Sequence, residues 1–179
     1  MSLSKAFILS HKKDNSTESM ADKIQIRQSV LDAVGGAVFD GCAGHGEMYK
    51  AVWKNADGYI GCGEKYFDKD HRTMFVCDNK RIMRNIDLTP FKIFDFDNYG
   101  SPWDQMIILS ARRKVIPGEK IGIVITDGIG IRLKMGMMTN SLHNLVGGKK
   151  QTPGLFLGKD YIFMSAIKCI ARKMNCEIE

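Results

Sequence analysis

VFDGCAGHGEM, residues 38–48, joins an apolar run that ends in aspartate to a turn that holds three glycines and one alanine. A turn alone requires one glycine, or two at most. Three of them, at Gly41, Gly44 and Gly46, indicate that another group approaches the backbone closely. We therefore interpret the segment as a buried strand followed by a ligand-binding loop.

Strand-like apolar runs alternate with helical segments on both sides of this loop. The predicted strands cover 37–40, 58–65, 73–79, 91–97 and 120–128, and the predicted helices cover 22–34, 47–55, 80–87, 104–114 and 160–175. Because such alternation requires right-handed crossovers, it predicts an α/β fold with a doubly wound, mostly parallel sheet flanked by helices. Residues 128–158 show no clear periodicity, and CEIE (176–179) is expected to begin a sixth strand.

The length of 179 residues predicts one ordinary domain, 1–179. A hydrophobic content of 44% and a charged content of 26% are typical of a soluble globular protein. Residues 11–20 are polar, and we expect a flexible N-terminal segment over 1–20. No apolar run approaches the roughly 18 residues of a membrane span, and the N-terminus lacks the apolar core of a signal peptide, so no membrane partner is expected.

Five cysteines form no CxxC pair, and with four scattered histidines they show no zinc spacing. This usage predicts a reduced, cytoplasmic protein without a metal site. The net charge of +6 leaves two interpretations open: scattered solubilising charge, or a surface that faces nucleic-acid phosphates. The basic clusters are KRIMR (80–84), ARRK (111–114), IRLK (131–134), KK (149–150) and KCIARK (168–173).

Acidic residues follow the predicted strands, at the sheet edge where ligands bind in such folds. Asp40 ends the first strand, Glu64 follows the second, and Asp78 follows the third. Asp95 and Asp97 close the fourth. Glu64 lies 24 residues after Asp40, a spacing that fits an acid accepting hydrogen bonds from ribose hydroxyls. A nucleoside-like ligand is therefore expected against the glycine loop.

The ligand is not expected to bind through a pyrophosphate. No GK[ST] sequence, which a P-loop requires, occurs in the chain. Glu47 follows the loop directly, and an acid there would repel phosphate while remaining compatible with a cationic sulfonium.

DGCAGHG (40–46) resembles motif I of the class I S-adenosylmethionine-dependent methyltransferases. In that family the loop packs on the amino-acid and ribose parts of the cofactor. The acid after the second strand binds the ribose hydroxyls, and the acid after the third meets the adenine amine. The resemblance implies a Rossmann-like methyltransferase fold, here without its last two strands, and S-adenosyl-L-methionine as cofactor. The implied cofactor-binding residues are Asp40, Gly41, Cys42, Ala43, Gly44, Gly46, Glu64, Asp78 and Asp95.

FDFDNYGSP (94–102) resembles the Asp-Pro-Phe-Gly-(Ser/Thr)-Pro segment of the tRNA guanine-N2 dimethyltransferases, except that Asn98 replaces the proline. GIVITDGIG (122–130) resembles the strand and the Thr-Asp turn that follow in those enzymes. The resemblance implies methylation of an exocyclic base amine in RNA, with Asp97, Asn98 and Tyr99 as catalytic residues. An acceptor at 97–98 would orient the amine and localise its lone pair, and Tyr99 would stack on a base that has left its helix.

Other interpretations of these residues remain open. The chain could methylate a small molecule or a protein. It could instead be a non-catalytic module with a cofactor-binding fold. Asn98 in place of proline and the short C-terminus favour this second alternative. Residues 95–102 could form a polar turn without a catalytic role. His45 is interpreted as a loop residue rather than a base, and MGMM (135–138) as a flexible apolar cover.

Overall fold

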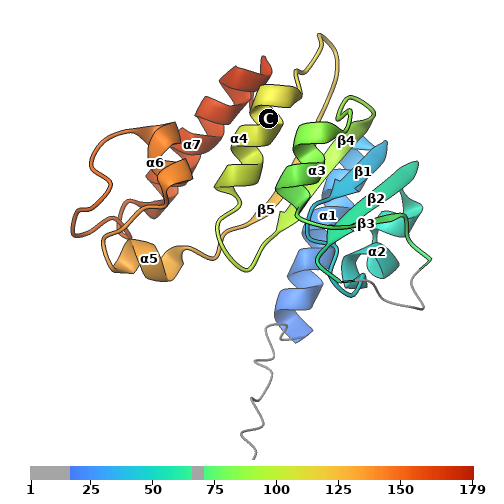
Figure 1. The fold of residues 1–179 in the computed structure, drawn as a ribbon, viewed down its shortest axis with the longest axis horizontal. Helices are drawn as coiled ribbons and strands as arrows, with labels where there is room; N and C mark the ends of the chain where they lie inside the picture. The colour runs from blue at the N-terminus through green and yellow to red at the C-terminus, as the bar shows by residue number, and fades with distance from the viewer. Residues whose placement is uncertain (1–16, 66–70) are drawn as a thin grey trace, which may run out of the picture.

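The structure is a computed structural model and describes residues 17–65 and 71–179. Within these residues, one sheet of five parallel strands in the order β3-β2-β1-β4-β5 forms the centre (Figure 1). The strands are β1 (Ala37–Asp40), β2 (Gly58–Gly63), β3 (Met74–Val76), β4 (Phe91–Asp97) and β5 (Gly122–Thr126). The predicted α/β fold with a doubly wound parallel sheet is confirmed.

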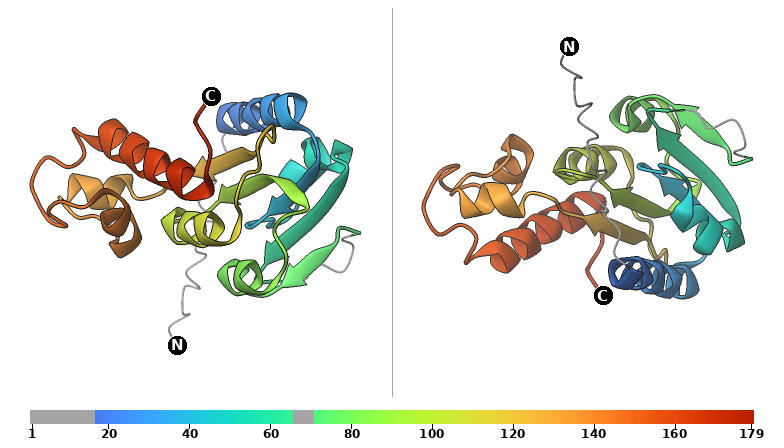
Figure 2. Two further views of the ribbon diagram at one scale, coloured as in Figure 1. Left: turned by 90° about the horizontal axis from the view of Figure 1, so that it is seen from above. Right: turned by 90° about the horizontal axis from the view of Figure 1, so that it is seen from below.

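Helices cover both faces of the sheet (Figure 2). The helix α1 contacts β4 and β5 from one face, and α3 and α4 pack against each other on the opposite face. The long helix α7 contacts α4 and α6 and extends beyond the β5 edge. The helices are α1 (Thr17–Val34), α2 (Glu47–Ala51), α3 (Asn79–Asn85), α4 (Trp103–Arg112), α5 (Gly130–Lys134), α6 (Asn140–Val146) and α7 (Lys159–Met174), with a 3-10 turn, η1 (Trp53–Asn55).

The helix α1 begins five residues before its predicted start at residue 22. Residues 17–20 are therefore helical and not part of a flexible segment, because TESM continues the helix without glycine or proline. Residues 1–16 of that predicted segment lie outside the described residues. Gly35 ends the helix in a left-handed conformation, with φ at +62° and its N–H bonded to the Leu31 carbonyl at 2.8 Å.

Alternate residues of the central strands supply two separate cores. Phe39 and Phe94 belong to the large core under α3, α4 and α7, whereas Val38 and Ile93 pack with Trp53 on the α1 face. Successive strand side chains point to opposite faces. Both faces are therefore buried, which explains why the central strands are almost continuously apolar.

The predicted sixth strand is wrong, since 176–179 form no strand and β5 pairs with β4 alone among the described residues. Asn175, in a left-handed conformation, ends α7, and the tail borders a groove of about 380 Å³ between α1, β5 and α7. Residues 128–158, left unassigned from sequence, contain α5 and α6. None of the described helices is both long and apolar enough to cross a membrane.

Candidate functional site

A cavity of about 580 Å³ lies at the carboxyl ends of β1, β2, β3 and β4. The strand order reverses between β1 and β4, and ligands bind at this switch point in open α/β sheets. The volume falls within the roughly 300–1,000 Å³ of small-molecule sites. The cavity brings together eight of the predicted residues, namely Gly41, Cys42, Gly44, Glu64, Asp78, Asp97, Asn98 and Tyr99.

Four predicted cofactor residues do not border the cavity, namely Asp40, Ala43, Gly46 and Asp95. Asp40 and Ala43 are buried, and the Arg72 guanidinium covers Gly46. Asp95 is 1% exposed and is not part of the cavity lining. Both of its carboxylate oxygens bind side chains of the protein interior, so none faces a ligand.

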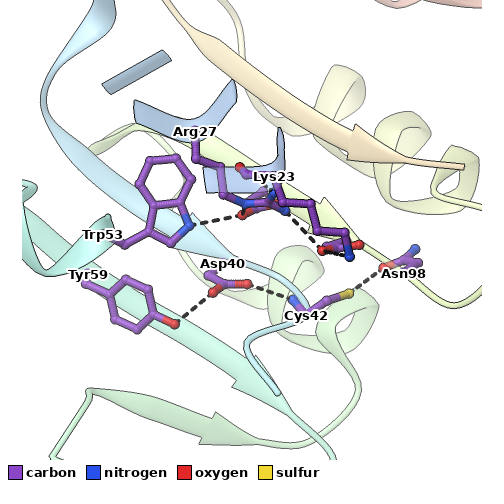
Figure 3. A network of polar contacts seen from close by, with 9 residues as sticks. Lys23, Arg27, Asp40, Cys42, Trp53, Tyr59 and Asn98 are labelled. Atoms are coloured by element: carbon purple, nitrogen blue, oxygen red, sulfur yellow. Dashed lines mark hydrogen bonds and ion pairs between the residues drawn. The ribbon is translucent and has the colours of Figure 1, made fainter. Parts of the chain in front are cut away.

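Arg27 and Asp95 form an ion pair in which each side chain is 1% exposed (Figure 3). Arg27 Nε and Nη2 donate to the two Asp95 oxygens at 2.6 and 2.9 Å, and Trp53 Nε1 donates to Asp95 Oδ2 at 3.0 Å. Arg27 Nη2 also lies 3.2 Å from Asp97 Oδ2, to which Lys23 Nζ donates at 2.8 Å. The helix α1 thus fixes the end of β4, where the cavity begins.

Gly41 and Gly44 carry different constraints in the glycine loop. A Cβ on Gly41 would lie 2.8 Å from Cδ1 of Phe96, so the close approach at this position is to the protein itself. Gly41 N–H also donates to the Asp95 carbonyl at 2.8 Å. Gly44 has φ at +43°, and a Cβ there would meet only the Cys42 carbonyl oxygen, at 3.9 Å. A Cβ on Gly44 would therefore stand in open space, and Gly44 borders the cavity.

Arg72 holds the glycine loop from outside the cavity. Its Nη1 donates to the Ala43 carbonyl at 2.9 Å and its Nη2 to the Gly44 carbonyl at 3.0 Å. The guanidinium also lies 6.0 Å from the centre of the Tyr49 ring. Sequence reasoning missed this buried arginine because it is 28 residues from the loop and no motif marks it.

Asn79 and Gln105 form a second set of residues that sequence reasoning missed. Asn79 Nδ2 donates to the Gly41 carbonyl at 2.6 Å, so Asn79 Oδ1 is the acceptor for Gln105 Nε2 at 3.3 Å. This chain fixes the Gln105 amide with Oε1 as its remaining polar atom. The side chain is 6% exposed and borders the cavity, and Oε1 has no partner among the described residues. A buried acceptor without a donor favours a ligand that supplies an N–H or O–H.

Cys42 and Asn98 meet across the cavity floor (Figure 3). The Cys42 thiol donates to Asn98 Oδ1, and Asn98 Nδ2 donates to the Ser101 carbonyl at 3.2 Å. Burial, followed by the Asp40 charge, raises the pKa of Cys42 to about 12, which keeps the thiol protonated at neutral pH. The thiol therefore orients Asn98 and does not act as a thiolate nucleophile.

The acids that border the cavity differ in their surroundings. Burial raises the pKa of Asp97, but hydrogen bonds from Lys23 and Thr126 and the Arg27 charge outweigh burial and hold this pKa below its ordinary value. Asp97 is therefore ionised at neutral pH. Asp78 is exposed and caps α3 through Oδ1, which accepts from Lys80 N–H at 2.8 Å. Glu64 is also exposed at the cavity rim.

Asp40→Asn is expected to flatten the pH dependence of stability. Asp40 accepts from Cys42 N–H and from the Tyr59 hydroxyl, at 3.1 and 2.9 Å, and burial, with the Asp95 charge second, raises its pKa to about 7. The unfolded carboxyl titrates near about 4, so the native state binds more protons between about pH 4 and pH 7, and stability falls as pH rises through that window. Asparagine carries no proton to lose there. Urea unfolding of the wild-type and Asp40→Asn proteins at about pH 5 and about pH 8 measures how the free energy of unfolding changes with pH in each. An equal change in the two proteins would contradict protonation of Asp40 in the native state.

Comparisons of the chain with protein-family models, with curated proteins and with solved structures found no match. Within 17–65 and 71–179, no group of three or more His, Cys, Asp or Glu side chains is placed to hold a metal ion. The cavity offers, instead, a glycine wall, exposed acids at the rim, the amide side chain of Gln105 and an exposed aromatic ring. These groups suit a small organic ligand with hydrogen-bond donors and a second, planar ligand at the entrance.

Proposed function

We propose that the protein is an S-adenosylmethionine-dependent methyltransferase that methylates an exocyclic base amine in RNA. One observation carries the proposal: residues expected to bind the cofactor and residues expected to bind the acceptor border the same cavity. Gly44 and Glu64 lie in the segments that follow β1 and β2, and residues 97–99 lie at the end of β4 and directly after it. Methyl transfer requires this adjacency, because donor and acceptor must be aligned for in-line displacement.

The residues present fit the cofactor. The open space beside Gly44 admits a ligand against the loop backbone, and the rim carboxylate of Glu64 can accept hydrogen bonds from ribose hydroxyls. The cofactor supplies an electrophilic methyl group, and the protein supplies its alignment with the acceptor.

The acceptor end of the cavity suits a base amine. An exocyclic amine is a poor nucleophile because its lone pair is delocalised into the ring. Asp97 or the Asn98 carbonyl accepts a hydrogen bond from the amine, which orients it and localises the lone pair. Tyr99, 93% exposed at the cavity entrance, offers its ring for stacking on a base that has left its helix.

A non-catalytic binding module is the second candidate. Asp97 Oδ2 already binds Lys23 and Arg27, which weakens this oxygen as an acceptor for a substrate amine. Asn98 also stands where the tRNA enzymes carry proline. Under this alternative the same cavity binds the cofactor without turnover.

The transfer of labelled methyl groups from S-adenosylmethionine separates these functions. We expect incorporation into an RNA pool from which this modification is absent, and none into protein. Incorporation into protein or a small molecule alone would assign another acceptor class. Cofactor binding without transfer to RNA, DNA, protein or small molecules would favour the non-catalytic module.

Glu64→Ala is expected to weaken cofactor binding without unfolding the protein. A hydrogen bond to a charged group contributes about 1.5–3 kcal/mol, so affinity should fall by at least about tenfold. Glu47→Ala is the matched control, because Glu47 is an exposed acid that does not border the cavity. Calorimetry measures both affinities, and equal affinities in the two variants would move the ribose contact elsewhere.

A further inference from the structure

Residues 128–159, here termed the basic excursion, contain five Lys or Arg residues and no Asp or Glu. They therefore carry five of the six net positive charges of the chain. The excursion begins two residues after the end of β5 and contains α5 and α6. Charge separated in this way indicates a surface for a polyanion rather than evenly spread solubilising charge.

The excursion folds so that two distant cations border one small cavity. Residues 150–152 lie beside 136–138, because Met138 N–H donates to the Lys150 carbonyl at 3.0 Å and Thr152 N–H donates to the Gly136 carbonyl at 2.9 Å. An antiparallel bridge joins Met137 to Gln151 between these two bonds. The resulting cavity has a volume of about 260 Å³, and its polar lining comes from Arg132, Lys150, Gln151, Thr139 and Asn140.

The cavity presents donors to an anion. Arg132 and Lys150 are exposed, and neither forms an ion pair with an acidic side chain of the described residues. The side-chain amides of Asn140 and Gln151 add uncharged donors. A guanidinium can bind two oxygens of one phosphate, and an ammonium adds a point charge. The chemistry of the lining therefore matches a phosphate group.

This small cavity is connected to the candidate site through the loop after β4. The Thr139 hydroxyl, which borders the small cavity, lies 3.5 Å from the Ser101 hydroxyl, three residues beyond Asn98. Gly128 N–H donates to the Gly100 carbonyl at 2.9 Å, so the start of the excursion is bonded to the residue after Tyr99. A strand that stacks a base on Tyr99 can therefore place a neighbouring phosphate over the excursion.

We propose that the small cavity at Arg132 and Lys150 binds a backbone phosphate of a single-stranded nucleic acid, and that the basic excursion guides this strand to Tyr99. The inference rests on the proposed function only in taking the acceptor to be RNA. Exposed apolar side chains near these cations, Ile131 on α5 and Met135 directly after it, offer further contact to unstacked bases.

Arg132→Gln/Lys150→Gln tests the inference in a titration of labelled single-stranded RNA by fluorescence anisotropy, without cofactor. Two lost phosphate contacts should weaken binding by about tenfold or more at about 0.1 M salt and lower the log–log salt slope by about 1.4. The carbonyl of Lys150 and the backbone of residue 132 hold the fold, so the side-chain changes should leave the melting temperature unchanged.

Lys54→Gln/Lys173→Gln is the matched control, since it removes the same charge at exposed positions outside the excursion. The control pair should retain the affinity and salt slope of the wild-type protein. Equal losses in the two double variants would show that net charge alone attracts RNA and would overturn the assignment. An unchanged affinity in the Arg132 and Lys150 variant, or no RNA binding by the wild-type protein at low salt, would overturn it as well.

The failure of this inference is distinguishable from failure of the proposed function. If RNA binding depends on Arg132 and Lys150 while the cofactor does not bind, the surface assignment holds and the methyltransferase proposal fails. If the cofactor binds and methyl transfer to RNA is unaffected by the two substitutions, the methyltransferase proposal holds and the surface assignment fails.

Discussion

Asp97→Ala is expected to lower methyl transfer by about 10²-fold or more, the scale of losing one positioned polar partner. Asp97 borders the cavity at the end of β4 and is ionised at neutral pH, so it can accept a hydrogen bond from the acceptor amine. Cofactor affinity should change little, because Glu64 and the glycine loop provide the cofactor contacts. Turnover per folded molecule and cofactor affinity are measured on one preparation.

Two variants separate catalysis from stability at this position. Asp97→Asn keeps an acceptor oxygen in place and should recover part of the lost turnover, although it loses charge opposite Lys23 and Arg27. Asp104→Ala removes an exposed acid that does not border the cavity and should leave turnover unchanged. If Asp97 and the turn that follows it have only a structural role, Asp97→Ala will lower the melting temperature while turnover per folded molecule stays intact. That result would contradict a catalytic role for Asp97.

Arg27→Met is expected to reduce the free energy of unfolding by about 3–5 kcal/mol, because it leaves the Asp95 carboxylate buried without its cation. Trp53 Nε1 would remain as one donor to that carboxylate, at 3.0 Å. This loss is a large fraction of the stability of a domain, about 5–15 kcal/mol. Urea unfolding followed by far-UV circular dichroism measures it.

A double substitution shows whether the loss comes from the buried charge. Arg27→Met/Asp95→Leu removes both ions and should recover part of the stability lost in Arg27→Met, since apolar replacement of a whole buried pair is often tolerated. Arg81→Met changes an exposed arginine on α3 and should shift stability by less than about 0.5 kcal/mol. A double variant less stable than Arg27→Met would contradict the proposed origin of the loss.

The central strands could be predicted from sequence because local signals bound them. β1 and β4 have the predicted limits, 37–40 and 91–97. Their apolar runs lie between strong chain breakers, with Gly36 and Gly41 around the first and Pro90 before the second. Burial on both faces makes the runs nearly continuous, so periodicity was not needed to find them.

Elements held by distant contacts were not predictable in this way. α5 and α6 are five and seven residues long, which is too short for a clear helical period in the sequence. Backbone hydrogen bonds between distant residues, such as that from Met138 N–H to the Lys150 carbonyl, hold the chain around them. Arg27 is bonded to a carboxylate 68 residues away, and Gln105 to an amide 26 residues away. A single sequence does not show which distant residues will meet.

The glycine loop shows how a correct observation can have more than one cause. The three glycines did indicate close approach to the backbone, but at Gly41 the approaching group is the Phe96 ring, and at Gly46 it is the Arg72 guanidinium. Gly44 is the glycine with open space that borders the cavity. Composition alone cannot separate these causes, because each of them excludes a Cβ.

Gly44 therefore provides the most direct test of cofactor binding, by calorimetric titration with S-adenosylhomocysteine. Gly118→Val is the matched control. Gly118 has φ at +82° and open surroundings, so valine strains the backbone there as it does at Gly44, but Gly118 does not border the cavity. We expect saturable binding to the wild-type and Gly118→Val proteins and its loss in Gly44→Val. At about 100 times the dissociation constant, the ligand should raise the free energy of unfolding by about 2.7 kcal/mol. No binding to the wild-type protein at millimolar ligand, or equal binding to all three proteins, would contradict a cofactor site at this loop.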